Sequence, residues 1–221
     1  MYSQSYAWIY SQNGATTGVI ATIHLIPRLD TVAGVTFGVN SLFDLRGNGT
    51  CYIGRVLYSL KSSEETKLVG TVYTGPEPIA AADGHVGDWQ TEVEAQVVHE
   101  MNRRLTLVSE TNFGWDTRDP ENNDHTSRWF GTYGMAIAHL DPLLDLNFRA
   151  EWFDDIDGSR IGTRGQYGEV TGGINLMPES FLNFRPEVRW DGADNSVFGP
   201  TTVAHLNRHQ WTYAFETLVK F

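Results

Sequence analysis

The sequence has no run of apolar residues long enough to form a transmembrane helix. A helix that crosses a bilayer needs about 18 or more consecutive apolar residues, and no stretch of the 221 residues meets that requirement. The mean hydropathy is slightly negative, at −0.30. If the chain crosses a membrane, it must therefore do so with strands whose two faces differ in polarity.

Cysteine and basic residues are also scarce. The single cysteine, Cys51, excludes an internal disulfide framework and is expected to be an inert thiol. With 16 Lys and Arg against 27 Asp and Glu, the formal net charge is −11. No basic stripe is present to meet phosphate groups, which argues against nucleic-acid binding.

Catalytic and metal-binding motifs are missing as well. A serine hydrolase needs a nucleophile, a histidine base and an orienting partner held together. The seven histidines instead lie in expected loops, at strand ends or on strands far apart in the sequence. No metal-ligand spacing such as HExxH occurs. We therefore expect neither an enzyme nor a cofactor.

What the sequence does have is a period of two, and it is clearest in the last twelve residues. One face carries Trp211, Tyr213, Phe215, Val219 and Phe221, and the other carries Gln210, Thr212, Glu216 and Lys220. Such alternation turns one set of side chains toward an apolar medium and the other toward water. A transmembrane strand and a half-buried soluble strand both show it, so repetition along the chain has to separate them.

The alternation recurs with a charged polar face in the segments 89–99, 144–153 and 182–191. In the last of these, Arg185, Glu187, Arg189 and Asp191 share a face. Burying such a face in a dry core would carry a heavy desolvation cost. The apolar face must therefore meet the hydrophobic medium, and the charged face must be wet.

This template predicts an all-β, antiparallel, up-and-down transmembrane β-barrel of about eleven strands. The expected strands are Gly18–Ile26, Thr31–Ser41, Cys51–Leu60, Thr66–Thr74, Trp89–Glu100, Leu105–Trp115, Arg128–Leu140, Leu144–Phe153, Tyr167–Met177, Leu182–Asp191 and His209–Phe221. Their connections alternate between short turns and long loops rich in Gly, Asp, Asn and Pro. That alternation is typical of an outer-membrane barrel with short periplasmic turns and long outer loops.

Several motifs carry a family resemblance over nearly the whole chain. They are TTGVIATIHL, YTGPEP, RWFGTYGMAIAHLD, FRAEWFDDIDGSRIG, YGEVTGGINLMP, NFRPEVRWD and QWTYAFETLVKF. The sequence thereby resembles the outer-membrane β-barrel porins of the OmpL-like kind. The resemblance implies a passive pore for small hydrophilic solutes in the bacterial outer membrane, without a cofactor or a catalytic residue.

The amino terminus departs from that family pattern. Met1–Gly14 has no basic region followed by an apolar core, so it does not read as an export signal. An antiparallel barrel also needs an even number of strands. We therefore expect residues 1–17 to be an outer loop or the remnant of an upstream strand, residues 18–221 to be the barrel wall, and the chain to be the carboxy-terminal part of a larger porin. The alternative is that Ser3–Tyr10 adds a twelfth strand and closes a smaller barrel.

The inward positions define the candidate pore lining. It comprises Arg55, Glu92, Glu94, Glu110, Asp145, Arg149, Glu151, Glu169, Arg185, Glu187, Arg189, Asp191, Glu216 and Lys220. Facing carboxylates and guanidinium groups would create a field that orients solutes, and an excess of acids would favour cations. A charged belt is expected from Arg149 and Glu151 on one strand and from Arg185, Glu187 and Arg189 two strands later. Glu169, on the strand between them, is placed to bridge the two groups. The same pairs could instead merely satisfy one another and stiffen the wall.

The remaining expectations concern partners. Tyr213, Phe215, Val219 and Phe221 resemble the terminal signal read by the outer-membrane insertion machinery. The lipid bilayer and lipopolysaccharide are expected partners, and a homotrimer is possible for such a pore. An alternative function is a surface receptor or adhesin that uses the acidic loops at 116–124 and 154–157, although neither loop has the ligand spacing of a calcium site.

Overall fold

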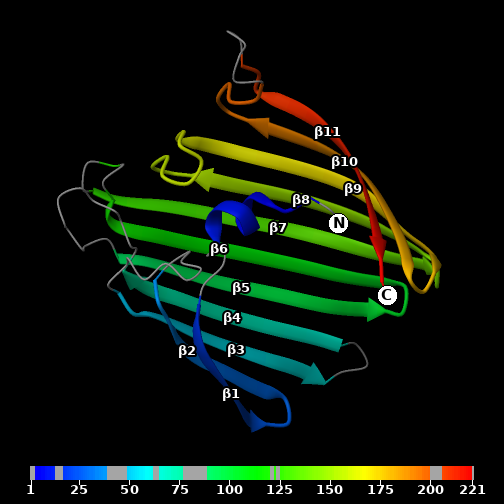
Figure 1. The fold of residues 1–221 in the computed structure, drawn as a ribbon, viewed down its shortest axis with the longest axis horizontal. Helices are drawn as coiled ribbons and strands as arrows, with labels where there is room; N and C mark the ends of the chain where they lie inside the picture. The colour runs from blue at the N-terminus through cyan, green and yellow to red at the C-terminus, as the bar shows by residue number, and fades with distance from the viewer. Residues whose placement is uncertain are drawn as a thin grey trace.

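The protein forms one antiparallel sheet of eleven strands in chain order, as the computed structural model shows (Figure 1). The structure describes residues 3–12, 17–38, 49–61, 65–76, 89–119, 122, 125–199 and 206–220. The strands are β1 (Gly18–Ile26), β2 (Leu29–Thr36), β3 (Cys51–Lys61), β4 (Glu65–Pro76), β5 (Trp89–Asn102), β6 (Leu105–Asp119), β7 (His125–Asp141), β8 (Leu144–Asp155), β9 (Gly165–Glu179), β10 (Leu182–Ala193) and β11 (His209–Val219). None of the described helices is long and apolar enough to cross a membrane.

The prediction of eleven antiparallel strands is confirmed, with shifts at the strand ends. The second strand begins earlier than expected, at Leu29, and its expected end at 39–41 lies outside the described residues. β7 is the longest strand, with 17 residues. Since about 9–11 tilted residues cross a bilayer, the longer hairpins extend beyond that thickness. β11 ends at Val219, and Phe221 lies outside the described residues.

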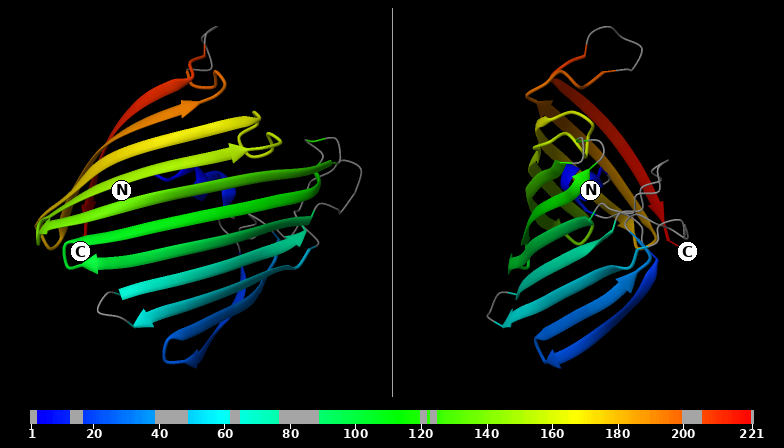
Figure 2. Two further views of the ribbon diagram at one scale, coloured as in Figure 1. Left: turned by 180° about the vertical axis from the view of Figure 1, so that it is seen from behind. Right: turned by 90° about the vertical axis from the view of Figure 1, so that its left-hand side faces the viewer.

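The sheet is strongly curved, and its two edge strands swing toward the same side (Figure 2). The result is a wall with one concave and one convex face. β1 and β11 are not hydrogen-bonded to each other within the described part of the chain, so the sheet is not closed there. Every neighbouring pair is antiparallel, and β1 and β11 therefore run in the same direction.

The convex face is apolar, as the alternation predicted. Tyr213 is 79% exposed and Phe215 is 65% exposed on this face. The Phe184 ring stacks on Phe215 near the short-turn end, with ring centroids 6.0 Å apart. Near the long-loop end, Phe130 packs against Trp152 at 5.5 Å. Aromatic pairs thus lie toward both ends of the strands, as membrane–water interfaces require.

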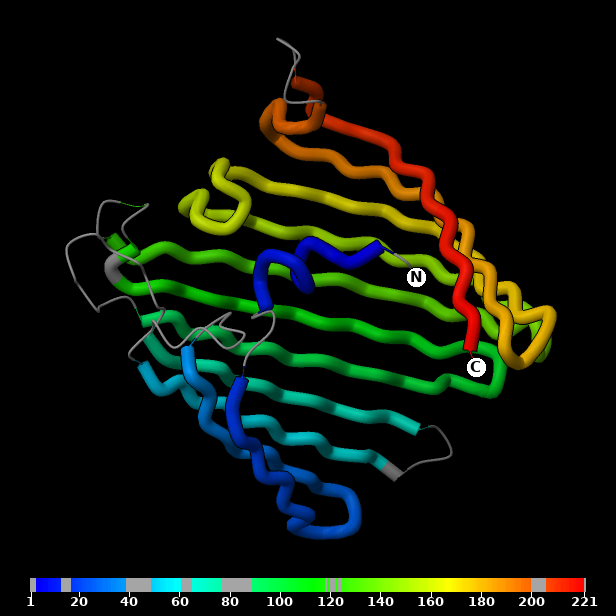
Figure 3. Tube along the Cα trace, viewed as in Figure 1, coloured from blue at the N-terminus to red at the C-terminus, as the bar shows by residue number. Residues whose placement is uncertain are grey.

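The amino-terminal segment, defined here as residues 3–12, lies across the concave face (Figure 3). It ends in η1 (Ala7–Ser11), a short π-helical turn that contacts β6 and β7. The alternative of a twelfth strand at Ser3–Tyr10 is therefore wrong. We expected residues 1–17 to be an outer loop or the remnant of an upstream strand. Residues 3–12 instead fold inward onto the wall.

A small aromatic cluster joins the segment to the wall. Tyr6 packs with Trp129, Phe153 and Tyr167, and all four are buried. Gly131 of β7 makes this close approach possible, because a Cβ there would lie 3.1 Å from the Cβ of Ala7 and 3.1 Å from the Phe153 ring. The largest buried apolar core of the described residues is therefore inside the curve of the sheet, beneath η1.

Candidate functional site

The concave face carries the charged side chains that the period-two pattern assigned to it. Directly paired residues of neighbouring strands share a face, so the strand register orders them. On this face lie Arg55, Glu92, Glu94, Glu110, Asp145, Arg149, Glu151, Glu169, Arg185, Glu187, Arg189, Asp191 and Glu216. The residues next to each of these along its strand, most of them apolar, point to the convex face.

Ion pairs link these charges across β8, β9, β10 and β11. Arg149 Nη2 lies 2.8 Å from Glu169 Oε2, and both side chains are buried. Arg189 Nη1 lies 3.7 Å from the same Glu169 oxygen, and Arg189 Nη2 lies 2.7 Å from Asp191. Glu169 therefore bridges the two arginines in the position that the sequence predicted. Arg185 pairs with Glu216 on β11.

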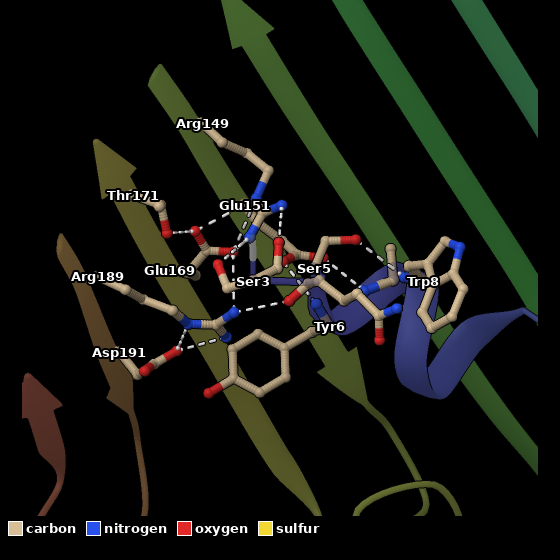
Figure 4. Close-up of polar contacts among 12 residues, drawn as sticks. Ser3, Ser5, Tyr6, Trp8, Arg149, Glu151, Glu169, Thr171, Arg189 and Asp191 are labelled. Carbon is tan, nitrogen blue, oxygen red and sulfur yellow. Dashed lines mark hydrogen bonds and ion pairs between the residues drawn. The ribbon is translucent and has the colours of Figure 1, made fainter. Parts of the chain in front are cut away.

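Two charged residues of β8 bind the backbone of the amino-terminal segment (Figure 4). The Glu151 carboxylate accepts hydrogen bonds from the N–H of Tyr6 at 2.7 Å and of Ala7 at 2.5 Å. Arg149 Nη1 donates to the carbonyl oxygen of Ser3 at 3.0 Å. Bonds to a charged partner are the stronger class of hydrogen bond. The inner charges thus hold a chain segment as well as one another.

Further contacts hold the segment at both ends. Arg189 donates to the carbonyl oxygen of Gln4 at 2.7 Å, and Glu187 accepts from the N–H of Ser3 at 3.1 Å. At the other end, Gln12 Nε2 donates to Glu110 at 2.6 Å. The segment is therefore bound from β6 to β10.

Tyr6 lies at the centre of these contacts. The Arg189 guanidinium carbon is 5.0 Å from the centroid of the Tyr6 ring, a cation–π distance. Burial raises the pKa of the Tyr6 phenol, and the negative charge of Asp191 acts in the same direction. Tyr6 is therefore neutral at physiological pH, and its hydroxyl keeps its proton.

Comparisons with known proteins agree with this geometry. A family model described as "Putative beta-barrel porin-2, OmpL-like" matches residues 1–221. The chain belongs to this porin family. A solved structure titled "NanC porin structure in rhombohedral crystal form" is similar, with a TM-score of 0.51 and 10% identity over 93% of each chain. At that identity the likeness shows the fold alone. No curated protein matches the chain.

Three of the proposed pore-lining residues lie away from the amino-terminal segment. Lys220 follows β11 and is exposed at the short-turn rim, because the strand ends at Val219. Arg55 is exposed and donates to Thr71 Oγ1 at 3.1 Å. Asp145 lies near the short turn between β7 and β8, where it bonds to His139 at 2.8 Å. None of these three contacts the amino-terminal segment in the described residues.

Sequence reasoning missed the segment residues Ser3, Tyr6, Ala7 and Gln12 as partners of the porin lining. Two signals could have pointed to them. The stretch from Tyr2 to Tyr10 contains four aromatic residues, an unusual density for a solvated loop. The inward carboxylates also outnumber the inward bases, so hydrogen-bond donors from elsewhere are needed for those that are buried.

One constellation that the sequence did not reveal lies on the same face. Thr106 Oγ1 is 3.4 Å from His139 Nε2, and His139 Nδ1 is 2.8 Å from Asp145. The order of hydroxyl, imidazole and carboxylate is that of a hydrolase triad. Hydrolases also need donors for an oxyanion, whereas the N–H of His139 already donates to the carbonyl oxygen of Arg104. The porin family and fold indicate a channel rather than an enzyme.

The acidic loop at 154–157 is held together by its own contacts. Asp155 is buried and accepts hydrogen bonds from the N–H groups of Gly158, Arg160 and Ile161. Asp157 accepts from the N–H of Arg128 at 3.0 Å. In the acidic loop at 116–124, Glu121 and Asp124 lie outside the described residues. Among the described residues, no group of three or more His, Cys, Asp or Glu is placed to hold a metal ion.

Proposed function

We propose that this protein is an outer-membrane porin that forms a passive, water-filled channel for small hydrophilic solutes and ions. The observation that carries the proposal is the contrast between the two faces of the wall. The convex face exposes Phe215 and its apolar neighbours, while the concave face carries ion pairs such as Arg149 with Glu169. Only a wet lumen surrounded by lipid satisfies both faces at once.

The amino-terminal segment would act as a constriction in that channel. It is held on the concave face by Arg149, Glu151 and Arg189 rather than lying above the wall. A segment on the inner wall reduces the cross-section open to solutes and places its own side chains along their route. The proposed constriction combines the charges of the wall with the aromatic rings of the segment.

The test uses two neighbouring glycines that point in opposite directions from β9. Gly173 is paired with Glu187 on the concave face, whereas Gly172 is paired with Val188 on the convex face. A Cβ at Gly172 would meet nothing within 4 Å, and one at Gly173 would make only ordinary contacts of 3.5 Å or more. Both positions can therefore accept a side chain.

Gly173→Trp should lower single-channel conductance in planar bilayers and slow the swelling of vesicles in a small sugar. Gly172→Trp should leave both unchanged, because its ring points to lipid. Comparable heat-modifiable barrel bands for the two variants would show equal folding. A complete absence of solute-dependent flux in the wild-type protein would refute the porin assignment.

The same segment favours one alternative, a surface receptor or adhesin whose lumen is plugged. Deletion of residues 3–12 distinguishes the two functions. If the wild-type protein conducts and the deletion raises its conductance, the segment is a constriction in a porin. If current appears only after the deletion, the segment is a plug, and the acidic outer loops become the candidate binding surface.

The Thr106–His139–Asp145 constellation calls for a direct assay of hydrolysis. We expect purified protein to release no product from a lipid or peptide ester reporter, because the porin family and fold indicate a channel rather than an enzyme. Turnover that disappears in Thr106→Ala and persists in Thr111→Ala would contradict this expectation and establish an enzyme.

A further inference from the structure

A groove opens on the concave face at its long-loop end, beside the amino-terminal segment. Its volume is about 670 Å³, within the range of roughly 300–1,000 Å³ typical of small-molecule sites. The side chains on which its chemistry depends are Tyr6, Tyr10, Arg189, Asp191, Gln210 and Thr212. They come from the segment, from β10 and from β11, and Phe198 of the loop between these strands also borders the groove.

One side of the groove is aromatic. The rings of Tyr6 and Tyr10 are stacked, with centroids 6.0 Å apart and planes inclined by 22°. Tyr6 is fixed by its contacts with Phe153 and Tyr167, so a ligand would not have to order it. Tyr6 is itself buried, so the ring that faces the groove is that of Tyr10, which is only half-buried. An aromatic face in a wet groove attracts the C–H groups of a ligand ring, and the Tyr10 hydroxyl offers a hydrogen bond.

The other side of the groove is polar but balanced in charge. Asp191 is neutralised by Arg189, whose Nη2 lies 2.7 Å away. Gln210 donates its amide to Asp191 at 3.2 Å, which turns its carbonyl oxygen away from that carboxylate. Thr212 is exposed on β11, opposite Arg189 in the strand register. This side therefore offers hydrogen-bonding groups without a dominant charge.

We propose that the groove is a binding subsite for an uncharged saccharide on its way through the channel. A pyranose ring has one apolar C–H face and a rim of hydroxyl groups, which matches an aromatic wall opposite amide, hydroxyl and carboxylate groups. The charge balance between Arg189 and Asp191 gives no advantage to an ionic ligand. The inference rests on the proposed porin function, and it adds a substrate class and a site of selection.

The experiment titrates maltotriose into single-channel recordings of the complete protein, from the long-loop side. Maltotriose should reduce the ion current with a saturable, concentration-dependent block. Tyr10→Leu and Gln210→Ala should each weaken the block about threefold to tenfold, because one ring contact or one hydrogen bond is lost. Gln166→Ala should not change it, because Gln166 follows Gly165 on β9 and points to the convex face.

Two further probes separate binding from simple occlusion. A polyethylene glycol of similar size should block less than maltotriose, and an anionic trigalacturonate should bind no more tightly than the neutral sugar. Equal block by the glycol, or tighter binding of the anion, would overturn the saccharide proposal while leaving the porin function intact. Unchanged block in both Tyr10→Leu and Gln210→Ala would exclude this groove.

A failure of the channel itself can be recognised separately. If the wild-type protein does not conduct, the porin function fails, and calorimetric titration of the detergent-solubilised protein with maltotriose then tests the groove alone. Binding that is weakened in Gln210→Ala but unchanged in Gln166→Ala would support the site. No measurable heat with the folded wild-type protein would refute it.

Discussion

Glu151 illustrates how one inward charge shapes the site. The Glu151 carboxylate accepts hydrogen bonds from the backbone N–H groups of Tyr6 and Ala7, and Glu151 is only 7% exposed. A glutamine would keep one oxygen but place an amide donor against the second N–H. Leaving one buried donor without a partner costs about 1–3 kcal/mol. Glu151 is therefore a principal anchor of the amino-terminal segment.

Glu151→Gln should loosen the segment without unfolding the wall. Hydrogen–deuterium exchange at the amides of Tyr6 and Ala7 should become about 10-fold to 100-fold faster, as a loss of that size implies. Glu100→Gln is the matched control, because Glu100 is exposed near the end of β5. Unchanged exchange in Glu151→Gln would show that the aromatic contacts of Tyr6 hold the segment unaided.

At the scale of the element, the eleven residues of β11 form an apolar convex face and a polar concave face. Tyr213, Phe215 and Val219 are exposed on the convex face, while Glu216 pairs with Arg185 on the concave face. As an edge strand, β11 pairs only with β10 in the described sheet, so its outward aromatic residues are among the most exposed in the protein. We propose that this face, continued to Phe221, is the segment that the outer-membrane insertion machinery reads.

Phe221→Asp or deletion of Phe221 should strongly reduce the amount of folded barrel in the outer membrane. Phe215→Asp should also lower the level, because a carboxylate on the lipid face destabilises the strand in the bilayer, by less than the roughly 2–4 kcal/mol that Arg or Lys costs at the midplane. Glu216→Gln changes the opposite face and should retain near-normal insertion. The measurement is the heat-modifiable band in isolated outer membranes, and wild-type levels of the Phe221 variants would argue against a terminal signal.

At the scale of the whole molecule, the curvature gathers the inward charges of seven strands, β3, β5, β6, β8, β9, β10 and β11, on one surface. Acids outnumber bases there, and three of the bases, Arg149, Arg185 and Arg189, are engaged in ion pairs. The field of the lumen is therefore expected to be negative, most strongly at β5, where Glu92 and Glu94 face the same side. Asp116 and Asp119 lie toward the long-loop end and add to this field.

Reversal potentials measured under a salt gradient should show a modest preference for cations that weakens as salt concentration rises, because ions screen the field. Glu92→Gln with Glu94→Gln should reduce the preference. Glu100→Gln serves as a control for the loss of one acid near the short-turn rim. Anion selectivity of the wild-type channel would contradict the prediction.

The edges of the sheet set a further constraint on the whole molecule. β1 and β11 run in the same direction, so pairing them directly would create a parallel seam. An antiparallel closure requires an odd number of additional strands between them. β1 is exposed along its entire length, with Val19 70% and Ile20 61% exposed. The backbone N–H and C=O groups along such an edge need a partner strand in a bilayer, because lipid offers no hydrogen bonds.

The sequence by itself determined the strands, their order and the side to which most side chains point. Each of these follows from local physics: the pleat has a period of two, and a hairpin turn pairs strands that are adjacent in the chain. The faces assigned to Arg149, Glu187 and Phe215 could therefore be read from neighbouring residues. The position of Glu169 between Arg149 and Arg189 likewise follows from the register of adjacent hairpins alone.

Only the tertiary structure decided what lies against the inner face. The bond from Tyr6 to Glu151 joins residues 145 positions apart, and Gln12 reaches Glu110 across 98 positions. No periodic pattern encodes such a contact, because it depends on the curvature of the complete sheet and on the space left above Gly131. The same curvature brings Tyr10 and Gln210 to opposite sides of one groove. The contacts on the inner face therefore depend on the curvature of the whole sheet, whereas the alternation of apolar and polar side chains is set within each strand.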